Sequence, residues 1–159
     1  MIFAVTIALV EKSTMKTIGE ILKNHEVRHV NASHSVLEAA SYMTRYNIGA
    51  VAVVQNDRLV GLFSERDLVQ RVVAAGKDVR TTKVAEVMTT DLVVARADED
   101  IRACVQRMVS ARVRHLPVVS GDRFVGMVAI MEMLQAQVSD LNLEVQMLTD
   151  YVYHIAPQK

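Results

Sequence analysis

Two pairs of short apolar runs stand out along the chain, and each pair is interrupted by a tight polar turn. GAVAVV-QND-RLVGLF (49–63) predicts one β-hairpin, and RHLPVV-SGD-RFVGMV (114–128) predicts another. Ahead of each hairpin, apolar residues recur every three or four positions, which is typical of a helix with one buried face. The pattern therefore predicts two units of mixed helix and strand.

The two units are copies of each other. VAVVQNDRLVGLFSERDLVQ (51–70) aligns without a gap on LPVVSGDRFVGMVAIMEMLQ (116–135), an offset of 65 residues. TIGEIL (17–22) and KVAEVM (83–88) match one residue out of that register and predict a short lead helix for each unit. A register kept over about 45 residues indicates a duplicated unit rather than a general amphipathic pattern.

Each unit reads as strand, helix, strand, strand and helix, after its lead helix. Ser35 with Glu38 predicts a capping box at the first inner helix, and Gly76 predicts the end of the first closing helix. Asp98, Glu99 and Asp100 supply negative charge where the second inner helix begins. The predicted organisation is an N-terminal extension (1–15), a first repeat (16–78), a second repeat (79–137) and a C-terminal helix extension (138–159).

Composition narrows the function classes. The 159 residues carry 18 basic and 18 acidic side chains and no Trp, which argues against a nucleic-acid binder. The apolar run at 1–10 is too short to span a bilayer and lacks a basic flank, so we expect no membrane segment there but an added strand or a mobile extension. Cys104 lies on an apolar helix face and is expected to be a small core residue. Nothing in the sequence indicates an oxidising compartment, so a cytoplasmic protein is expected.

Four polar residues follow the first hairpin, at the start of its closing helix. In GLFSERDL (61–68), Ser64 as N-cap and Asp67 three residues later predict a capping box, which explains both residues without a ligand. The same residues also suit a binding site, because a carboxylate beside free helix N–H groups can accept ribose hydroxyls. Gly61 would then allow a close approach of the backbone to the ligand. Both interpretations remain open at this stage.

These residues carry a resemblance to a known family. The run VVQNDRLVGLFSERD ending at Asp67, its echo ending at Glu132, and RHLPVV (114–119) resemble a tandem CBS (cystathionine-β-synthase) domain pair, or Bateman module, over roughly residues 16–137. The resemblance implies an α+β fold of two CBS repeats (β-α-β-β-α) packed about a pseudo-twofold axis, with a long C-terminal helix added here. It also implies two clefts between the repeats, each able to bind an adenosine-containing ligand. Such modules sense and regulate, so signal transduction is expected and an enzyme is not.

The resemblance assigns roles to particular residues. It implies that Asp67 holds the ribose hydroxyls, that Ser64 assists it, and that Arg114 and His115 of the second repeat meet the phosphate; the alternative for these two cations is a solvated basic edge. In the second copy Ala129 and Glu132 replace Ser64 and Asp67, so a second, degraded site is expected there. The ligand expected is an adenine nucleotide: AMP, ADP, ATP or NAD. The predicted nucleotide-binding residues are Ile48, Gly49, Leu62, Ser64, Arg66, Asp67, Arg114 and His115.

Other chemistry finds little support. His25, His29 and His34 lie close in sequence but across a predicted helix-to-strand junction, so no metal site is expected. No Gly-rich phosphate loop or nucleophile elbow is present, so no catalytic residue is assigned and a nucleotide-processing enzyme is disfavoured. The alternative to a sensor is a structural dimerisation or interaction module with vestigial clefts. In either case an unidentified protein partner is expected.

The C-terminal segment has a pattern of its own. Apolar residues recur at alternating spacings of three and four, with mostly Val at heptad position a and mostly Leu at d, which favours two parallel strands of a coiled coil. The pattern predicts a homodimer. The alternative is one long helix packed on its own domain, which Leu143 and Met147 outside the pattern would favour. The predicted seam consists of Met131, Leu134, Val138, Leu141, Val145, Leu148, Val152 and Ile155.

Overall fold

The computed structural model describes the backbone of residues 16–155 and the side chains of residues 16–149; the predicted N-terminal extension lies outside them. The β-α-β-β-α order is confirmed in both repeats. The first repeat comprises α2 (Ile18–Leu22), β1 (His29–Asn31), α3 (Val36–Tyr46), β2 (Ala50–Gln55), β3 (Arg58–Ser64), α4 (Glu65–Asp67) and its continuation η1 (Leu68–Val73). The second comprises η2 (Val84–Glu86), β4 (Ala95–Arg96), α5 (Ile101–Ala111), β5 (His115–Ser120), β6 (Arg123–Ala129) and α6 (Ile130–Ile155).

The strands form one mixed sheet of six in the order β1-β2-β3-β6-β5-β4. Each hairpin is antiparallel, and each outer strand adds in parallel. The two halves meet where Arg58 of β3 pairs with Arg123 of β6, and these residues are 65 positions apart, as the repeat requires. The predicted α+β fold of two β-α-β-β-α repeats related by a pseudo-twofold axis is thus confirmed.

Local signals in the sequence act as expected. Ser35 caps α3, since its side chain accepts from the Glu38 N–H while Glu38 accepts from the Ser35 N–H at 2.7 Å. Asn56 and Asp57 have positive φ in the first hairpin turn, the geometry that matches the twist of the flanking strands. Gly76 has φ +66° just after η1, which confirms it as the end of the closing helix.

The two repeats exchange their lead segments. Ile18 of α2 is fully buried in the core of the second repeat, and Val84 of η2 is fully buried in the core of the first. The backbone contacts are equivalent: the Ile18 N–H donates to the Glu99 carbonyl at 3.0 Å, and the Val84 N–H donates to the His34 carbonyl at 2.9 Å. Each core therefore contains residues from both sides of the predicted boundary between residues 78 and 79. The position of that boundary stays a prediction.

The exchange of lead segments explains why Gly61 and Gly126 have no side chain. A Cβ on Gly61 would lie 2.3 Å from Sδ of Met88, and a Cβ on Gly126 would lie 2.8 Å from Cδ2 of Leu22. Met88 follows η2 and Leu22 ends α2, so each glycine receives the lead segment of the other repeat. The interpretation of Gly61 as an approach point for a ligand is therefore wrong, because Met88 and the Thr89 backbone fill that space.

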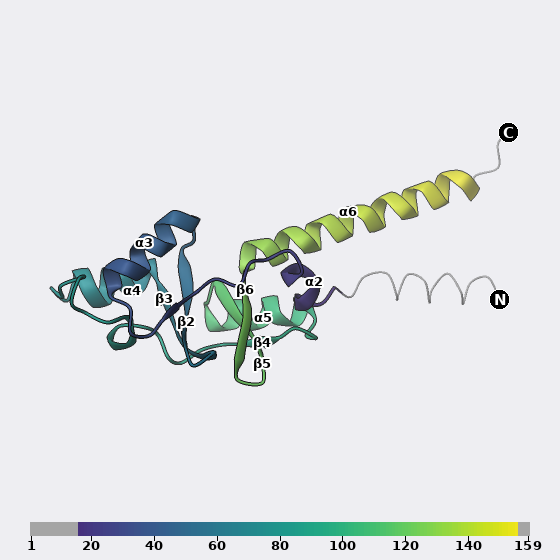
Figure 1. Ribbon diagram of the computed structural model, residues 1–159. Coiled ribbons are helices and arrows are strands. Elements are labelled where there is room, and N and C mark those ends of the chain that lie inside the picture. Colours follow the sequence, from purple (N-terminus) through teal and green to yellow (C-terminus); the bar gives the residue numbers. More distant parts are fainter. Residues whose placement is uncertain (1–15, 156–159) are drawn as a thin grey trace.

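Helix α6 runs from the end of β6 past the second repeat and away from the first (Figure 1). The first six seam residues, Met131 to Leu148, are 36–61% exposed, so this chain covers them only in part. The alternative in which the helix packs on its own domain holds where the helix begins, since Met133 is fully buried in the core of the second repeat. It does not hold farther along, since Leu143 and Met147 are more than half exposed. Within residues 16–155 no helix is long and apolar enough to cross a membrane.

Candidate functional site

One cavity lies where the first closing helix faces the start of β5. Its volume is about 380 Å³, within the range of small-molecule sites. It brings together residues of the first repeat and of the second, including the stretch between η2 and β4. We call it the Asp67 cleft, and it is lined by Gly49, Leu62, Ser64, Arg66, Asp67, Thr89, Asp91, Leu92, Val93, Ala111, Arg112, Val113, Arg114, His115 and Pro117.

Ser64 and Asp67 form the predicted capping box at the base of this cleft. The Ser64 hydroxyl donates to Oδ2 of Asp67 at 2.6 Å, and the Ser64 N–H donates to the same oxygen at 2.9 Å. The Asp67 N–H in turn donates to the Ser64 Oγ at 3.3 Å. The capping interpretation is confirmed. An ionised carboxylate has about four acceptor positions, and the two bonds from Ser64 occupy two of them.

The other oxygen of Asp67 contacts Thr89, in the segment after η2, and Arg71 of η1. The Thr89 hydroxyl donates to Oδ1 at 3.0 Å, and Nε of Arg71 lies 3.5 Å from the same oxygen. Thr89 is fixed in turn by a two-way backbone bridge to Leu62. Asp67 is only 6% exposed, and these contacts hold its carboxylate in one orientation.

The second repeat contributes the positive charge of the cleft. Arg112 and Arg114 line it beside His115, and Arg66 adds a fourth basic group from the first repeat. Burial lowers the pKa of His115 below its ordinary value, and Arg114 adds to that effect while Glu132 and Glu65 oppose it. The cations outnumber the two carboxylates, Asp67 and Asp91, so the cleft suits an anionic group.

A second cavity is the pseudo-symmetric counterpart of the first. Met127, Ala129 and Glu132 take the places that Leu62, Ser64 and Asp67 hold in the Asp67 cleft, 65 residues earlier. This Glu132 cleft has a volume of about 500 Å³. Gly49, just before β2, and His115, at the start of β5, line both clefts, so the two cavities adjoin where these two strands begin. The Glu132 cleft is lined by Asn24, His25, Glu26, Arg28, Asn47, Ile48, Gly49, Ala50, His115, Met127, Ala129 and Glu132.

The polar groups of the Glu132 cleft pair with one another. Oε2 of Glu132 accepts from the Ala129 N–H at 2.6 Å, the counterpart of the bond from the Ser64 N–H to Asp67. Oε1 lies 3.3 Å from Nε2 of His25. Arg28 donates to Glu26 at 2.9 Å and lies 4.5 Å above the ring of Tyr46. The cavity persists, but its one arginine is already paired.

The structure groups most of the predicted site residues. Seven of the eight predicted nucleotide-binding residues line the Asp67 cleft, whereas Ile48 lines the Glu132 cleft. Sequence reasoning missed Thr89 and the segment 91–93, and in the other cleft it missed Asn24 to Arg28. These stretches follow the two lead segments at equivalent positions. The 65-residue repeat relates the two stretches to each other. It could have pointed to the clefts only together with the exchange of lead segments, which the sequence does not show.

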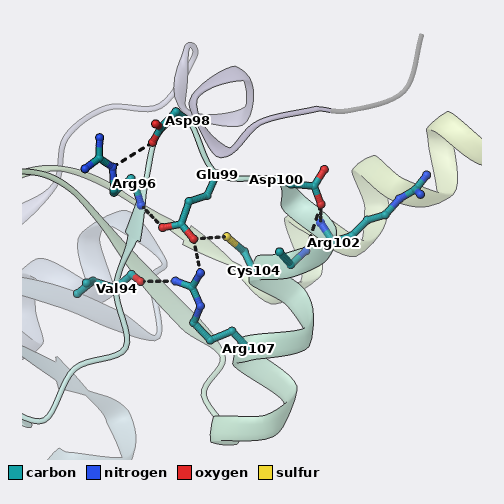
Figure 2. Close-up of polar contacts among 9 residues, drawn as sticks. Val94, Arg96, Asp98, Glu99, Asp100, Arg102, Cys104 and Arg107 are labelled. Carbon is teal, nitrogen blue, oxygen red and sulfur yellow. Dashed lines mark hydrogen bonds and ion pairs between the residues drawn. The ribbon is translucent and has the colours of Figure 1, made fainter. Parts of the chain in front are cut away.

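Cys104 belongs to a separate polar cluster beside α5, as Figure 2 shows. It is fully buried, and burial raises the pKa of its thiol, so the prediction of a core residue is confirmed. Its Sγ lies 3.9 Å from Oε2 of Glu99, which also accepts from Arg107. Arg107 lowers the pKa of Glu99 and donates to the Val94 carbonyl at 2.7 Å. The cluster ties α5 to the strand entering β4 and needs no ligand.

The three neighbouring histidines diverge in the structure. His25 pairs with Glu132, whereas His29 lies edge-on to Phe124 with ring centroids 6.3 Å apart. No group of three or more His, Cys, Asp or Glu side chains is arranged to hold a metal within the described part of the chain.

Comparison with known proteins gives consistent matches. The CBS domain family matches residues 18–74 and 84–139. The CBS domain-containing protein YhcV of Bacillus subtilis is 35% identical over 115 residues, which are 72% of this chain and 81% of YhcV. The mitochondrial CBS domain-containing protein CBSX3 of Arabidopsis thaliana is 31% identical over 123 residues, 74% of this chain but only 60% of CBSX3.

Solved structures agree with this result. The CBS domain protein NE2398 superposes with a TM-score of 0.73 at 31% identity, over 79% of this chain and 99% of that one. At 23% identity, the CBS domain pair of MJ0100 in complex with 5′-methylthioadenosine and S-adenosylmethionine gives 0.71, over 79% and 98% of the two chains. At 24% identity, a hexameric CBS-CP12 protein from bloom-forming cyanobacteria gives 0.67, over 76% and 71%. The last two likenesses show the fold alone.

Proposed function

The chain belongs to the family of CBS domain proteins, and from that premise we propose that it is a regulatory module which binds an adenine nucleotide in the Asp67 cleft. In this proposal the bound nucleotide is a signal, the chain performs no catalytic step, and a partner protein reads the occupancy. The cytoplasm is the proposed compartment.

One observation carries the proposal. The Asp67 cleft joins an oriented carboxylate from the first repeat to Arg112, Arg114 and His115 from the second. A ribose has two neighbouring hydroxyls that donate to a carboxylate, and a phosphate accepts from guanidinium groups. The two ends of a nucleotide thus match the two sides of the cavity.

The class of ligand has further support. The MJ0100 domain pair is described with two adenosyl compounds, which makes an adenosine-containing ligand the proposal for this chain. The arginines favour a phosphate-bearing member of that class, so AMP, ADP, ATP or NAD fits the cleft better than a sulfonium compound.

Two measurements test the proposal. Mass spectrometry of the solution released by denaturing the purified protein would identify a nucleotide that co-purifies with it. AMP in excess should also raise the melting temperature, because a ligand that binds only the folded state stabilises it. Asp67→Ala should remove most of this shift while the protein without ligand still melts cooperatively. Glu132→Ala is the matched control, since it alters the equivalent acid of the other cleft and should leave the shift largely intact.

A second candidate function is a structural module with vestigial clefts. It is favoured by the bonds that Asp67 already makes to Ser64 and Thr89, and by the missing hydroxyl at Ala129. The same measurements separate the two functions. If no nucleotide co-purifies and AMP, ATP and NAD all leave the melting temperature of the wild-type protein unchanged, the structural module is the better description.

We also propose that the chain forms a homodimer through α6. Six large apolar residues exposed in one line, Met131 to Leu148, make a patch that a monomer rarely tolerates. A second copy covers it with a self-complementary contact. Assembly has a precedent in the family, where the CBS-CP12 protein is hexameric. Light scattering at micromolar concentration decides between monomer and dimer.

A further inference from the structure

The closing helices of the two repeats expose apolar residues at equivalent positions. Val69 and Val73 of η1 are 59% and 64% exposed, and their counterparts 65 residues later, Leu134 and Val138 of α6, are 36% and 57% exposed. Both repeats thus offer an apolar strip that a second copy could cover. The strips alone do not determine which repeat of the partner lies on which.

The lengths of the two closing helices differ, and this difference is informative. The first ends at Val73, with Gly76 just beyond it, whereas α6 continues to Ile155 and is about 39 Å long. Leu141, Val145 and Leu148 continue the strip of α6 and are all more than half exposed. The first repeat has no counterpart for this part of the strip.

Two arrangements of a twofold dimer can be compared on this basis. If the second repeat faced the first repeat of the partner, Leu134 and Val138 would meet Val69 and Val73. The strip from Leu141 onward would then lie beyond the end of the partner's closing helix and stay in water. If the second repeat faces the second repeat of the partner, the two α6 helices run side by side and the whole strip is covered.

From this comparison we infer that the second copy docks like repeat to like repeat, with the two α6 helices parallel along their length. This inference rests on the dimer proposed above and specifies its orientation. Val at a, in Val138 and Val145, with Leu at d, in Leu134, Leu141 and Leu148, is the combination that favours two parallel strands. A parallel pair also brings the two second repeats together, so that Met131 is covered too.

The flanking positions of the helix offer no repulsion to this pairing. In a parallel pair, residues at g face residues at e of the next heptad in the partner. Gln137 would face Asn142, and Glu144 would face Thr149, so no like charges meet. Asp140, at position c and away from the seam, forms an ion pair with Lys16 of the same chain.

Cysteine crosslinking of the full-length protein tests the orientation. Val138→Cys and Val145→Cys place thiols seven residues apart at position a, and both should form intermolecular disulfides in most of the protein on mild oxidation. Leu143→Cys is the matched control, because it is exposed but at position f, and it should remain uncrosslinked. The wild-type protein measures the background, since its one cysteine, Cys104, is fully buried.

The alternative outcomes are distinct. Crosslinking at only one of the two positions would indicate antiparallel helices and overturn the orientation alone. Crosslinking at neither, in a protein that light scattering shows to be dimeric, would place the contact elsewhere and overturn both the orientation and the contact through α6. Disulfides formed when Val69→Cys and Leu134→Cys proteins are mixed would indicate unlike repeats in contact and overturn the orientation. A monomer in light scattering would remove the proposed dimer and the orientation together, without bearing on nucleotide binding.

Discussion

The hydroxyl of Thr89 donates to Oδ1 of Asp67 at 3.0 Å, although the two residues are 22 positions apart. The contact joins the segment after η2 to the first turn of the first closing helix. It orients the acid on which the proposed nucleotide site depends.

Thr89→Val should therefore destabilise the protein while keeping the shape of the side chain. The loss of a hydrogen bond to a charged, buried group predicts a decrease in the free energy of unfolding of about 1.5–3 kcal/mol. Urea denaturation measures it. Thr44→Val is the control, since that hydroxyl bonds the Ala40 carbonyl on the exposed side of α3 and should change stability by less than about 0.5 kcal/mol. Equal effects of the two substitutions would show that Thr89 does not hold Asp67.

Arg114→Ala should distinguish phosphate from nucleoside. Loss of a charge-assisted contact of about 1.5–3 kcal/mol predicts roughly ten- to a hundredfold weaker binding of AMP. Adenosine, which lacks the phosphate, should bind nearly as before. Calorimetric titration with both ligands measures the difference. A similar loss for AMP and adenosine would mean that Arg114 does not meet the phosphate and would favour the solvated basic edge.

His115 should make the stability depend on pH in a defined direction. Its pKa in the folded protein lies below the ordinary value near 6.5, chiefly because the ring is buried. Between these two pKa values the unfolded chain binds more protons than the folded one, so stability should fall as pH decreases below about 6.5. His115→Gln should lose less stability than the wild type over the same range. Thermal unfolding between about pH 5 and pH 8 shows this as converging curves; parallel curves would contradict it.

Gly61→Ala tests the exchange of lead segments. The added methyl group would lie 2.3 Å from Sδ of Met88 and 3.1 Å from the Thr89 carbonyl oxygen, so overpacking should cost about 1–3 kcal/mol. In a Met88→Ala background the same substitution should cost clearly less, because the side chain in its way is gone. A double-mutant cycle in urea measures this coupling. Additive effects would indicate that Met88 does not pack on Gly61.

Much of the fold could be predicted from the sequence because its signals are local or repeated. Ser35 with Glu38, the Asn56-Asp57 turn and Gly76 each act through neighbours in sequence, and the 65-residue register carries the same order of elements into the second repeat. The grouping of seven predicted residues in the Asp67 cleft follows from the family resemblance, which supplied a long-range contact that no local pattern contains.

The features that the sequence did not predict depend on contacts between segments far apart in the chain. The sequence suggests that Gly61 allows a ligand to approach the backbone, whereas the side chain of Met88, 27 positions later, lies against it. Thr89 was missed because nothing in a Thr-Thr-Asp stretch indicates which carboxylate it will meet. Leu143 and Met147 favour the alternative in which the helix packs on its domain, yet both are exposed, because hydrophobicity alone does not distinguish a buried helix face from one left for a partner.

The exchange of lead segments has a consequence for descent. Each core is completed by a segment from the other repeat, through Ile18 in one direction and Val84 in the other. An ancestral gene encoding one repeat would have met this requirement only by trading that segment with an identical neighbour, as an obligate assembly of two molecules. In a single polypeptide both halves of the exchange are always present together. The clefts can therefore differ between the copies, as they do at Ser64 and Ala129, while neither copy can be lost without exposing the core of the other.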